Sequence, residues 1–255
     1  MIDIEKAKKE FDLFVEKYDF NQFVIEAKYN HSYRVMENAR NIALSLNLDE
    51  EQVELATLIG LLHDIARFDQ YTQYKTFRDK DSFDHGDVGA KILEENDYIR
   101  KYIETDKYDN VIKTAISNHN KFKIDESIQD ELTLLHCKII RDADKLDIFK
   151  EATTDFWRTE QEIKDVENSY ITDNYYDQVK ERKQILRDEK PTKLGSVIQV
   201  VSFAFDLYFD YSKQVVADNY YIEEILGKFN YKDEVTKERI DKIKEILKDF
   251  LRNKQ

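Results

Sequence analysis

Only one proline and five glycines occur among the 255 residues of the chain. β-Rich proteins place both residues in many tight turns, so their scarcity argues against a β-rich architecture. The single cysteine, Cys137, excludes a disulfide framework and any zinc site built from cysteine ligands. Long apolar runs are also missing. The most apolar stretch, residues 197–208, is interrupted by Gln199 and Asp206 and is too short to span a membrane.

Positive charge is scarce relative to negative charge. The chain has 40 Lys and Arg residues against 53 Asp and Glu residues, a formal net charge of −13. Such a surface repels phosphate backbones, so we expect no non-specific binding of nucleic acid and no attraction to an anionic membrane. The N-terminus starts acidic and lacks the apolar segment of a signal peptide, which predicts a cytoplasmic protein.

Apolar residues recur at the three- and four-residue spacing of amphipathic helices along the whole chain. Asn30 and Asp49 are suitable N-caps for two of these helices, whereas the polar run 69–82 is expected to be a loop. The other predicted helices cover residues 1–18, about 85–96, 109–119, 130–150, 155–165, 172–188, 195–216 and 233–252. The pattern predicts an all-α fold.

The chain is expected to form one helical domain over residues 1–255. Its one clear breaker, at residues 190–192, separates two helices more readily than two domains. The last helix places Ile240, Ile243 and Leu247 on one face, which fits a helix that closes the core. A seam between two copies of the chain is the alternative for this face, so a homo-oligomer is left open.

Four of the five histidines lie on apolar faces of predicted helices. His31 precedes Val35 by one turn, and His63 lies with Asp64 inside an apolar segment. His85 and His119 also have apolar residues three to seven positions away. A single histidine in such a place is most simply a core residue with a satisfied hydrogen bond.

The carboxylate of Asp64 changes this interpretation. A buried carboxylate needs a cation, and an ion pair with Arg67, one turn later, would supply one. That pair does not explain four buried histidines, whereas imidazoles beside carboxylates are what a divalent-metal site requires. Asp144 is a further candidate because apolar Ile140 and Ile148 lie one turn to either side of it.

The order of these residues resembles the HD-domain superfamily of metal-dependent phosphohydrolases. The resemblance covers about residues 25–155 and leaves about 156–255 as a C-terminal helical extension. It rests on His31, then His63-Asp64, then Asp144 within the segment Ala-Asp-Lys-Leu-Asp. It implies a compact helical bundle in which His31, His63, Asp64 and Asp144 bind a first metal ion.

Two further histidines extend the resemblance to members of the superfamily that bind two metals. His85 and Gly89 match an H-x-x-x-G segment, and His119 matches a histidine near the end of the following helix. Both are therefore implied ligands of a second metal ion. The Gly-Tyr-Pro signature of the cyclic-dinucleotide branch is missing. His136 lies eight residues before Asp144, about 12 Å along a helix, too far to share its metal.

The resemblance implies hydrolysis of a phosphoester or phosphoanhydride through a metal-activated hydroxide. The substrate would be a small, phosphorylated and nucleotide-like metabolite. Asp64 is expected to bridge the two metals, with Mn or Fe as the expected metal and Mg, Zn, Ni and Co left open. Lys145 and Arg67 are candidate phosphate contacts. A surface position is the alternative for Lys145, and a carboxylate pair is the alternative for Arg67.

Two other functions use the same residues. A few HD-domain enzymes hold two irons with four histidines and two aspartates and activate oxygen, so a di-iron oxygenase is one alternative. A regulatory helical module with a structural metal is the other. The run 69–83 adds a possible site for a nucleotide, or is simply a solvated loop. Its cations and aromatic residues are Lys75, Arg78, Lys80, Tyr71, Tyr74 and Phe77.

Overall fold

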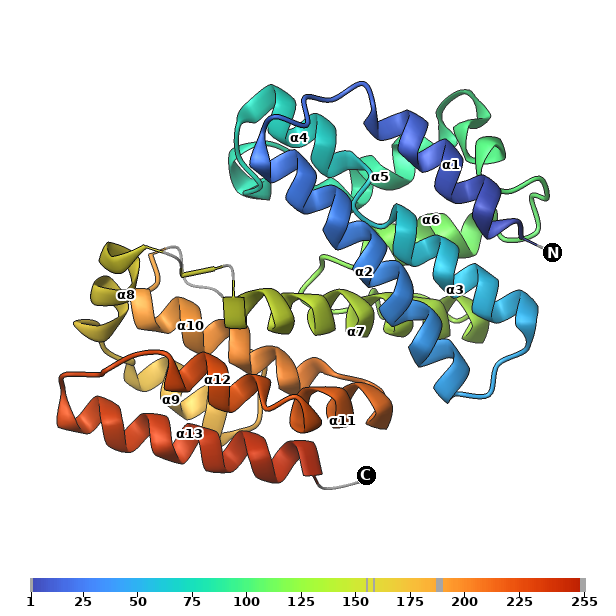
Figure 1. Ribbon diagram of the computed structural model, residues 1–255. Coiled ribbons are helices and arrows are strands. Elements are labelled where there is room, and N and C mark those ends of the chain that lie inside the picture. Colours follow the sequence, from blue (N-terminus) through green and yellow to red (C-terminus); the bar gives the residue numbers. More distant parts are fainter. Residues whose placement is uncertain (1, 155, 158, 187–189, 253–255) are drawn as a thin grey trace. The chain divides into compact units, whose positions relative to one another are not determined.

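The computed structural model describes residues 2–154, 156–157, 159–186 and 190–252. Within these residues it contains helices and no strand, which confirms the predicted all-α fold (Figure 1). In the same residues no helix is long and apolar enough to cross a membrane. The predicted helices that include residues 1, 155, 187 and 188 lie partly outside the described residues.

The chain divides into two compact units, residues 1–144 and 145–255. The division falls inside the long helix α7 (Glu131–Thr154) rather than after residue 155, where the sequence suggested the core to end. That residues 1–255 form one single domain stays a prediction. All six predicted metal ligands belong to the first unit.

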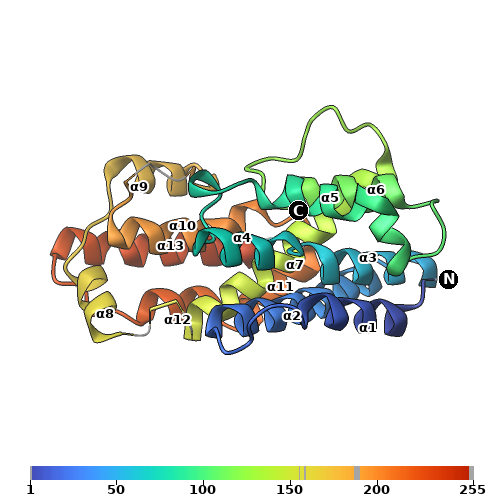
Figure 2. The ribbon, with the colours of Figure 1, turned by 90° about the horizontal axis from the view of Figure 1, so that it is seen from above.

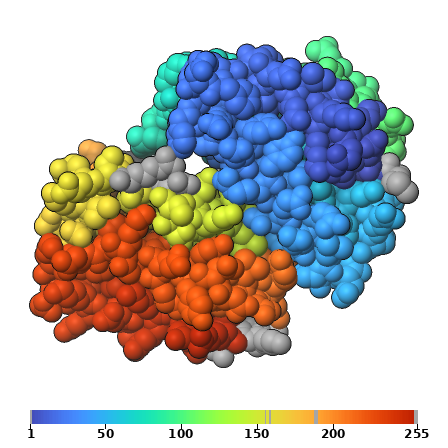
Figure 3. All heavy atoms as spheres, viewed as in Figure 1, coloured from blue at the N-terminus to red at the C-terminus, as the bar shows by residue number. Residues whose placement is uncertain are grey.

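The first unit is a bundle in which α2 packs against α3, and α5 against α6. Figures 1 and 2 show α2 and α3 side by side, and α1 and α2 lie on the face of this unit seen in Figure 3. Besides the first part of α7, its α-helices are α1 (Ile4–Val15), α2 (Phe23–Ser45), α3 (Glu50–Leu62), α4 (Ala66–Tyr74), α5 (His85–Glu94) and α6 (Asp109–Asn118). Two 3-10 helices, η1 (Asp79–Asp81) and η2 (Glu95–Lys101), flank α5.

Gly60 allows the close approach of α2 and α3. A Cβ atom at this position would lie 2.8 Å from the Cα of Met36 and 3.0 Å from the carbonyl oxygen of Val35. No real Cβ atom tolerates the first of these distances without movement of the backbone. The close contact lies one turn after His31 on α2 and one turn before His63 at the end of α3.

Two sequence-based boundaries in this unit are wrong, and one is confirmed. Asn30 does not cap α2, because the helix begins at Phe23 after Gln22, whose side chain makes no cap hydrogen bond. The run 69–82 is not a loop throughout, because α4 continues to Tyr74. Asp49 does cap α3, since its side chain accepts a hydrogen bond from the Gln52 backbone N–H.

The second unit begins with the last part of α7. It continues with α8 (Glu160–Glu167), α9 (Asp173–Lys180), α10 (Lys193–Ser202), the 3-10 helix η3 (Phe203–Asp206), α11 (Asp210–Asp218), α12 (Tyr221–Gly227) and α13 (Glu234–Arg252). The single helix predicted for 195–216 is therefore broken between α10 and α11. The apolar face of α13 packs against α11 and α12 with Ile240, Ile243 and Leu247 buried, so it closes the core of this unit as predicted.

Candidate metal centre

The six predicted ligands lie on, or directly after the end of, five helices of the first unit. His31 lies within α2, and His63 and Asp64 occupy the turn between α3 and α4. His85 is the first residue of α5 and His119 follows the last residue of α6. Asp144 lies on α7. The turn at 63–65 presents two successive side chains to one place, which neither helix could do at adjacent positions.

One group of ligand atoms forms around the imidazoles of His31 and His63. Their Nε2 atoms are 3.3 Å apart. Asp64 Oδ2 lies 3.6 Å from both of them, and Asp144 Oδ1 lies 3.2 Å from Nε2 of His31 and 3.8 Å from that of His63. Two neighbouring atoms that bind one ion at about 2.1 Å are separated by roughly 3 to 3.4 Å. The 3.2 to 3.8 Å spacing of this group is close to that of a shared ion and slightly wider.

A second group forms on the other oxygen of the same aspartate. Asp64 Oδ1 lies 3.5 Å from Nε2 of His85 and 3.5 Å from Nε2 of His119. The two Nε2 atoms are 3.1 Å from each other. All the members of both groups except Asp144 are buried. Asp64 therefore offers one oxygen to each group, which is the arrangement that a bridging ligand needs.

The hydrogen bonds of the other ring nitrogens show that these Nε2 atoms are lone-pair donors. Nδ1 of His63 contacts the Gly60 carbonyl oxygen at 2.8 Å, and Nδ1 of His119 contacts that of Ile116 at 2.6 Å. A carbonyl only accepts, so each Nδ1 carries the proton of its neutral ring and leaves Nε2 bare. Nδ1 of His85 likewise donates to a carboxylate. The bare Nε2 atoms of His85 and His119 face each other, an arrangement that a cation between them stabilises.

The protonation states also suit metal binding. Burial lowers the pKa of His63 to about 3 and that of His85 to about 4, so both rings are neutral near pH 7. Burial by itself would raise the pKa of Asp64, but the positive charges of Lys28 and Arg67 outweigh it and hold this pKa well below its usual range. Neutral imidazoles and ionised carboxylates are the forms in which these side chains bind metals.

Asp79 on η1 holds the ring of His85 in place. Its two carboxylate oxygens lie 2.8 and 2.7 Å from Nδ1 of His85. It also accepts hydrogen bonds from Gln70 at 2.9 Å and Asn120 at 3.1 Å, and it pairs with Arg67 at 3.1 Å. Burial would raise the pKa of Asp79, but its hydrogen bond with His85, reinforced by Gln70 and Arg67, lowers it well below the usual value. A carboxylate on the far nitrogen of a histidine is a common partner of metal-binding imidazoles.

The buried guanidinium of Arg141 holds the segment that carries His119. From α7 it donates to the backbone carbonyls of Asn118 at 3.1 Å, Lys121 at 2.5 Å and Phe122 at 3.2 Å. These carbonyls belong to the end of α6 and the turn after it, where helical partners run out. The position of His119 is thus set by a side chain of another helix.

The two predicted phosphate contacts have protein partners. Nε of Arg67 lies 3.4 Å from Asp64 Oδ1, and Nη1 also donates to Gln70 and to the Phe77 carbonyl. The contact between Arg67 and Asp64, which the sequence offered as the alternative to a phosphate contact, is therefore present. Lys145, the first residue of the second unit, pairs with Asp206 at 2.9 Å. A phosphate-binding role for either residue stays a prediction.

The cations and aromatic residues of the run 69–83 do not form one cluster. Arg78 pairs with Asp81 at 3.1 Å, and Lys75 lies over the ring of Tyr71. Phe77 packs on Tyr71, with ring centroids 5.2 Å apart, and lies beside Arg67 of the centre. Recognition of a nucleotide by this run stays a prediction.

His136 belongs to neither group of ligand atoms. It is buried, and its Nε2 contacts the side-chain oxygen of Gln52 at 2.9 Å. Cys137 beside it is also buried. Both are core residues, in agreement with the sequence-based interpretation.

Sequence reasoning missed Lys28 and Asp79, which both contact predicted ligands. Lys28 Nζ lies 2.9 Å from Asp64 Oδ2. Its only sequence signal is its position three residues before His31, on the same face of α2. Asp79 lies in a polar segment without periodicity, so no pattern distinguished it from its neighbours Asp81 and Asp84.

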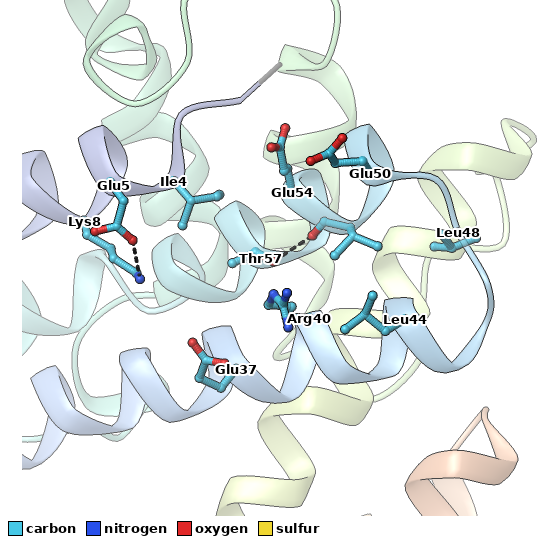
Figure 4. Close-up of a pocket in the computed structure, with 11 residues that line it drawn as sticks. Ile4, Glu5, Lys8, Glu37, Arg40, Leu44, Leu48, Glu50, Glu54 and Thr57 are labelled. Carbon is cyan, nitrogen blue, oxygen red and sulfur yellow. Dashed lines mark hydrogen bonds and ion pairs between the residues drawn. The ribbon is translucent and has the colours of Figure 1, made fainter.

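A hollow of about 550 Å³ lies between α1, α2 and α3, away from the six ligands (Figure 4). Acidic and basic side chains such as Glu37, Glu54, Lys8 and Arg40 line it together with apolar ones. None of the six predicted ligands contributes to its lining.

The comparisons with known proteins give one finding. A family model described as HD domain matches residues 29–148, a range that contains all six predicted ligands. No curated protein and no solved structure matches the chain.

Proposed function

Because residues 29–148 form an HD domain and so belong to a superfamily of metal-dependent phosphohydrolase type, we propose that the protein hydrolyses a phosphoester or phosphoanhydride. We place the reaction at the two groups of ligand atoms around Asp64. The proposed substrate is a small, phosphorylated and nucleotide-like metabolite, and the proposed compartment is the cytoplasm. The proposed metal is Mn or Fe.

The position of Asp64 is the observation that carries this proposal. Its Oδ2 faces His31 and His63, and its Oδ1 faces His85 and His119, at 3.5 to 3.6 Å in every case. Two metals held by these residues would supply activation of a water molecule and charge stabilisation on the phosphoryl oxygens. Asp144 is the fourth residue of the first group, whereas the second group consists of two imidazoles and Asp64.

The surrounding residues would hold this arrangement in place. The Gly60 and Ile116 carbonyls and the Asp79 carboxylate each fix one imidazole through its Nδ1. Such outer hydrogen bonds orient the rings and increase their basicity as ligands. Arg67 would contribute positive charge beside Asp64, and Lys145 would add a phosphate contact next to Asp144.

Hydrolysis of a generic phosphomonoester tests the proposal. We expect p-nitrophenyl phosphate hydrolysis to require added Mn²⁺, to stop with a chelator, and to fall to background in Asp64→Ala. The matched control is Asp69→Ala, which removes an aspartate that accepts a hydrogen bond from the Tyr18 hydroxyl at 2.9 Å and is not one of the six predicted ligands. We expect this control to keep its activity. Full activity of Asp64→Ala with chelator present would contradict the proposal.

A di-iron oxygenase is the second candidate, because the six side chains brought together are four histidines and two aspartates. Two cations beside Asp64, Lys28 and Arg67, favour an anionic phosphorylated substrate instead. Oxygen consumption by the iron-loaded protein, without phosphoester hydrolysis under any divalent metal, would establish the oxygenase. If the protein binds metal without exchangeable water and shows neither hydrolysis nor oxygen consumption, the regulatory module is indicated.

A further inference from the structure

Lys28 is a cation at the metal centre that has no assigned role. Its Nζ atom lies 2.9 Å from Asp64 Oδ2, the oxygen that also faces the imidazoles of His31 and His63. It extends from α2 one turn before His31, so one helix face carries both a ligand and this ammonium group.

The ammonium group of Lys28 has more hydrogen-bond donors than it uses within the protein. A lysine carries three N–H donors, and Asp64 is the one hydrogen-bond acceptor that the described residues offer to Nζ of Lys28. The side chain of Lys28 is 21% exposed, whereas that of Asp64 is 4% exposed. Lys28 therefore lies between the buried carboxylate and solvent, where an incoming anion would meet it.

Arg67 is less suited to this task than Lys28, although both flank Asp64. Nη1 of Arg67 is shared among Gln70, the Phe77 carbonyl and Asp79, all within the protein. The ring of Phe77 lies 5.5 Å from Nζ of Lys28 and 5.6 Å from Cζ of Arg67. This ring packs beside both cations and uses none of the hydrogen-bond donors of Lys28.

We propose that Lys28 is a substrate-binding residue that donates hydrogen bonds to the phosphoryl group. A phosphoryl oxygen placed beside Asp64 would meet a flexible point charge with free donors, which suits a phosphate group in several orientations. The inference rests on the proposed function, because it assumes that the centre receives a phosphate. It assigns Lys28 no part in holding the metals.

Binding of inorganic phosphate to the Mn²⁺-loaded protein tests this role without requiring turnover. We compare the parent with Lys28→Met, Lys28→Arg and the control Lys113→Met by calorimetry, and measure Mn²⁺ per chain in each. Lys113 is a matched control because its side chain is similarly accessible, at 29% exposed, and also pairs with a carboxylate, that of exposed Glu94 at 2.8 Å. We expect Lys28→Met to raise the Kd for phosphate about tenfold or more with unchanged metal content. Lys28→Arg should largely restore binding, and Lys113→Met should match the parent.

Three results would overturn the assignment. The first is a Kd for phosphate in Lys28→Met that equals that of the parent. The second is a parent protein that binds no phosphate. Loss of Mn²⁺ or of helical circular dichroism in Lys28→Met would show that the lysine only compensates the charge of Asp64. If phosphate binding depends on Lys28 but no phosphoester is hydrolysed, the assignment stands and the proposed hydrolase function fails. The two ideas can therefore be separated.

Discussion

At the scale of single residues, three of the predicted histidine ligands are each oriented by an oxygen atom that is not itself a predicted ligand. His63 and His119 use backbone carbonyls that lie three residues earlier in their own helices, at Gly60 and Ile116. His85 begins its helix and has no earlier turn to supply such a carbonyl. Asp79 takes the place of the carbonyl for this one imidazole.

This difference predicts a selective effect of the Asp79→Ala substitution. Without the carboxylate, the ring of His85 can rotate and its Nδ1 proton has lost its acceptor. Loss of such an outer partner typically weakens metal binding about 10- to 100-fold. We expect the parent to bind two Mn²⁺ ions per chain and Asp79→Ala to bind one tightly and the second 10- to 100-fold more weakly, as measured by calorimetry and elemental analysis.

The neighbouring Asp81→Ala substitution is the control, because Asp81 lies on the same short helix and pairs with half-exposed Arg78. It should bind Mn²⁺ as the parent does. Unchanged affinity for both ions in Asp79→Ala would show that His85 is held by its packing alone. A parent that binds a single ion at saturating Mn²⁺ would remove His85 and His119 from the ligand set.

At the scale of helices, residue type and apolar spacing identified the six predicted ligands that the structure brings together, whereas the residues that contact them were not predictable. His31, His63 and Asp144 each lie on or beside an apolar stripe, which distinguishes them from surface residues. Lys28 and Asp79 are charged and half-exposed, like many residues of a chain in which 36% are charged. Their role arises only from the packing of α2, η1 and α5 around the turn after α3.

Helix ends were predictable only where a local chemical signal marks them. Asp49 is a cap that the sequence reveals, whereas α2 begins after Gln22 without a side-chain cap. The break between α10 and α11 contains no glycine or proline, and residues 203–209 are largely apolar. The 3-10 helix in this apolar run could therefore not be recognised from the sequence, because it results from the packing of the second unit.

The crossing of α2 and α3 provides a prediction at this scale. A Cβ at position 60 would contact the Met36 backbone at 2.8 Å, so we expect Gly60→Ala to separate the helices and destabilise the protein by about 1–3 kcal/mol. The control is Gly227→Ala, because a Cβ there meets nothing within 4 Å. Thermal unfolding should show a lower Tm for Gly60→Ala, with an unchanged or slightly raised Tm for the control. Equal Tm values for Gly60→Ala and the parent would show that the crossing adjusts at no cost.

At the scale of the whole molecule, all six predicted ligands lie in residues 1–144, while α7 continues into the second unit. Metal binding stabilises the state that holds the ligands together, by about 2.7 kcal/mol at a metal concentration 100 times the Kd. Openings that release a ligand should then become up to about 100-fold rarer. How far this stabilisation spreads along the chain depends on whether the two units open separately or together.

Because the chain divides into two compact units, we expect the stabilisation by metal binding to be confined to the first unit. With Mn²⁺ added, we expect slower hydrogen exchange at the backbone amides around His63, His85 and His119, and no change in α13. Asp64→Ala should show no slowing at any position, because it lacks the carboxylate that faces both groups. Mass spectrometry of exchanged peptides measures both results. An equal slowing in α13 would mean that the units open as one, and would support the single domain over residues 1–255 that the sequence predicts.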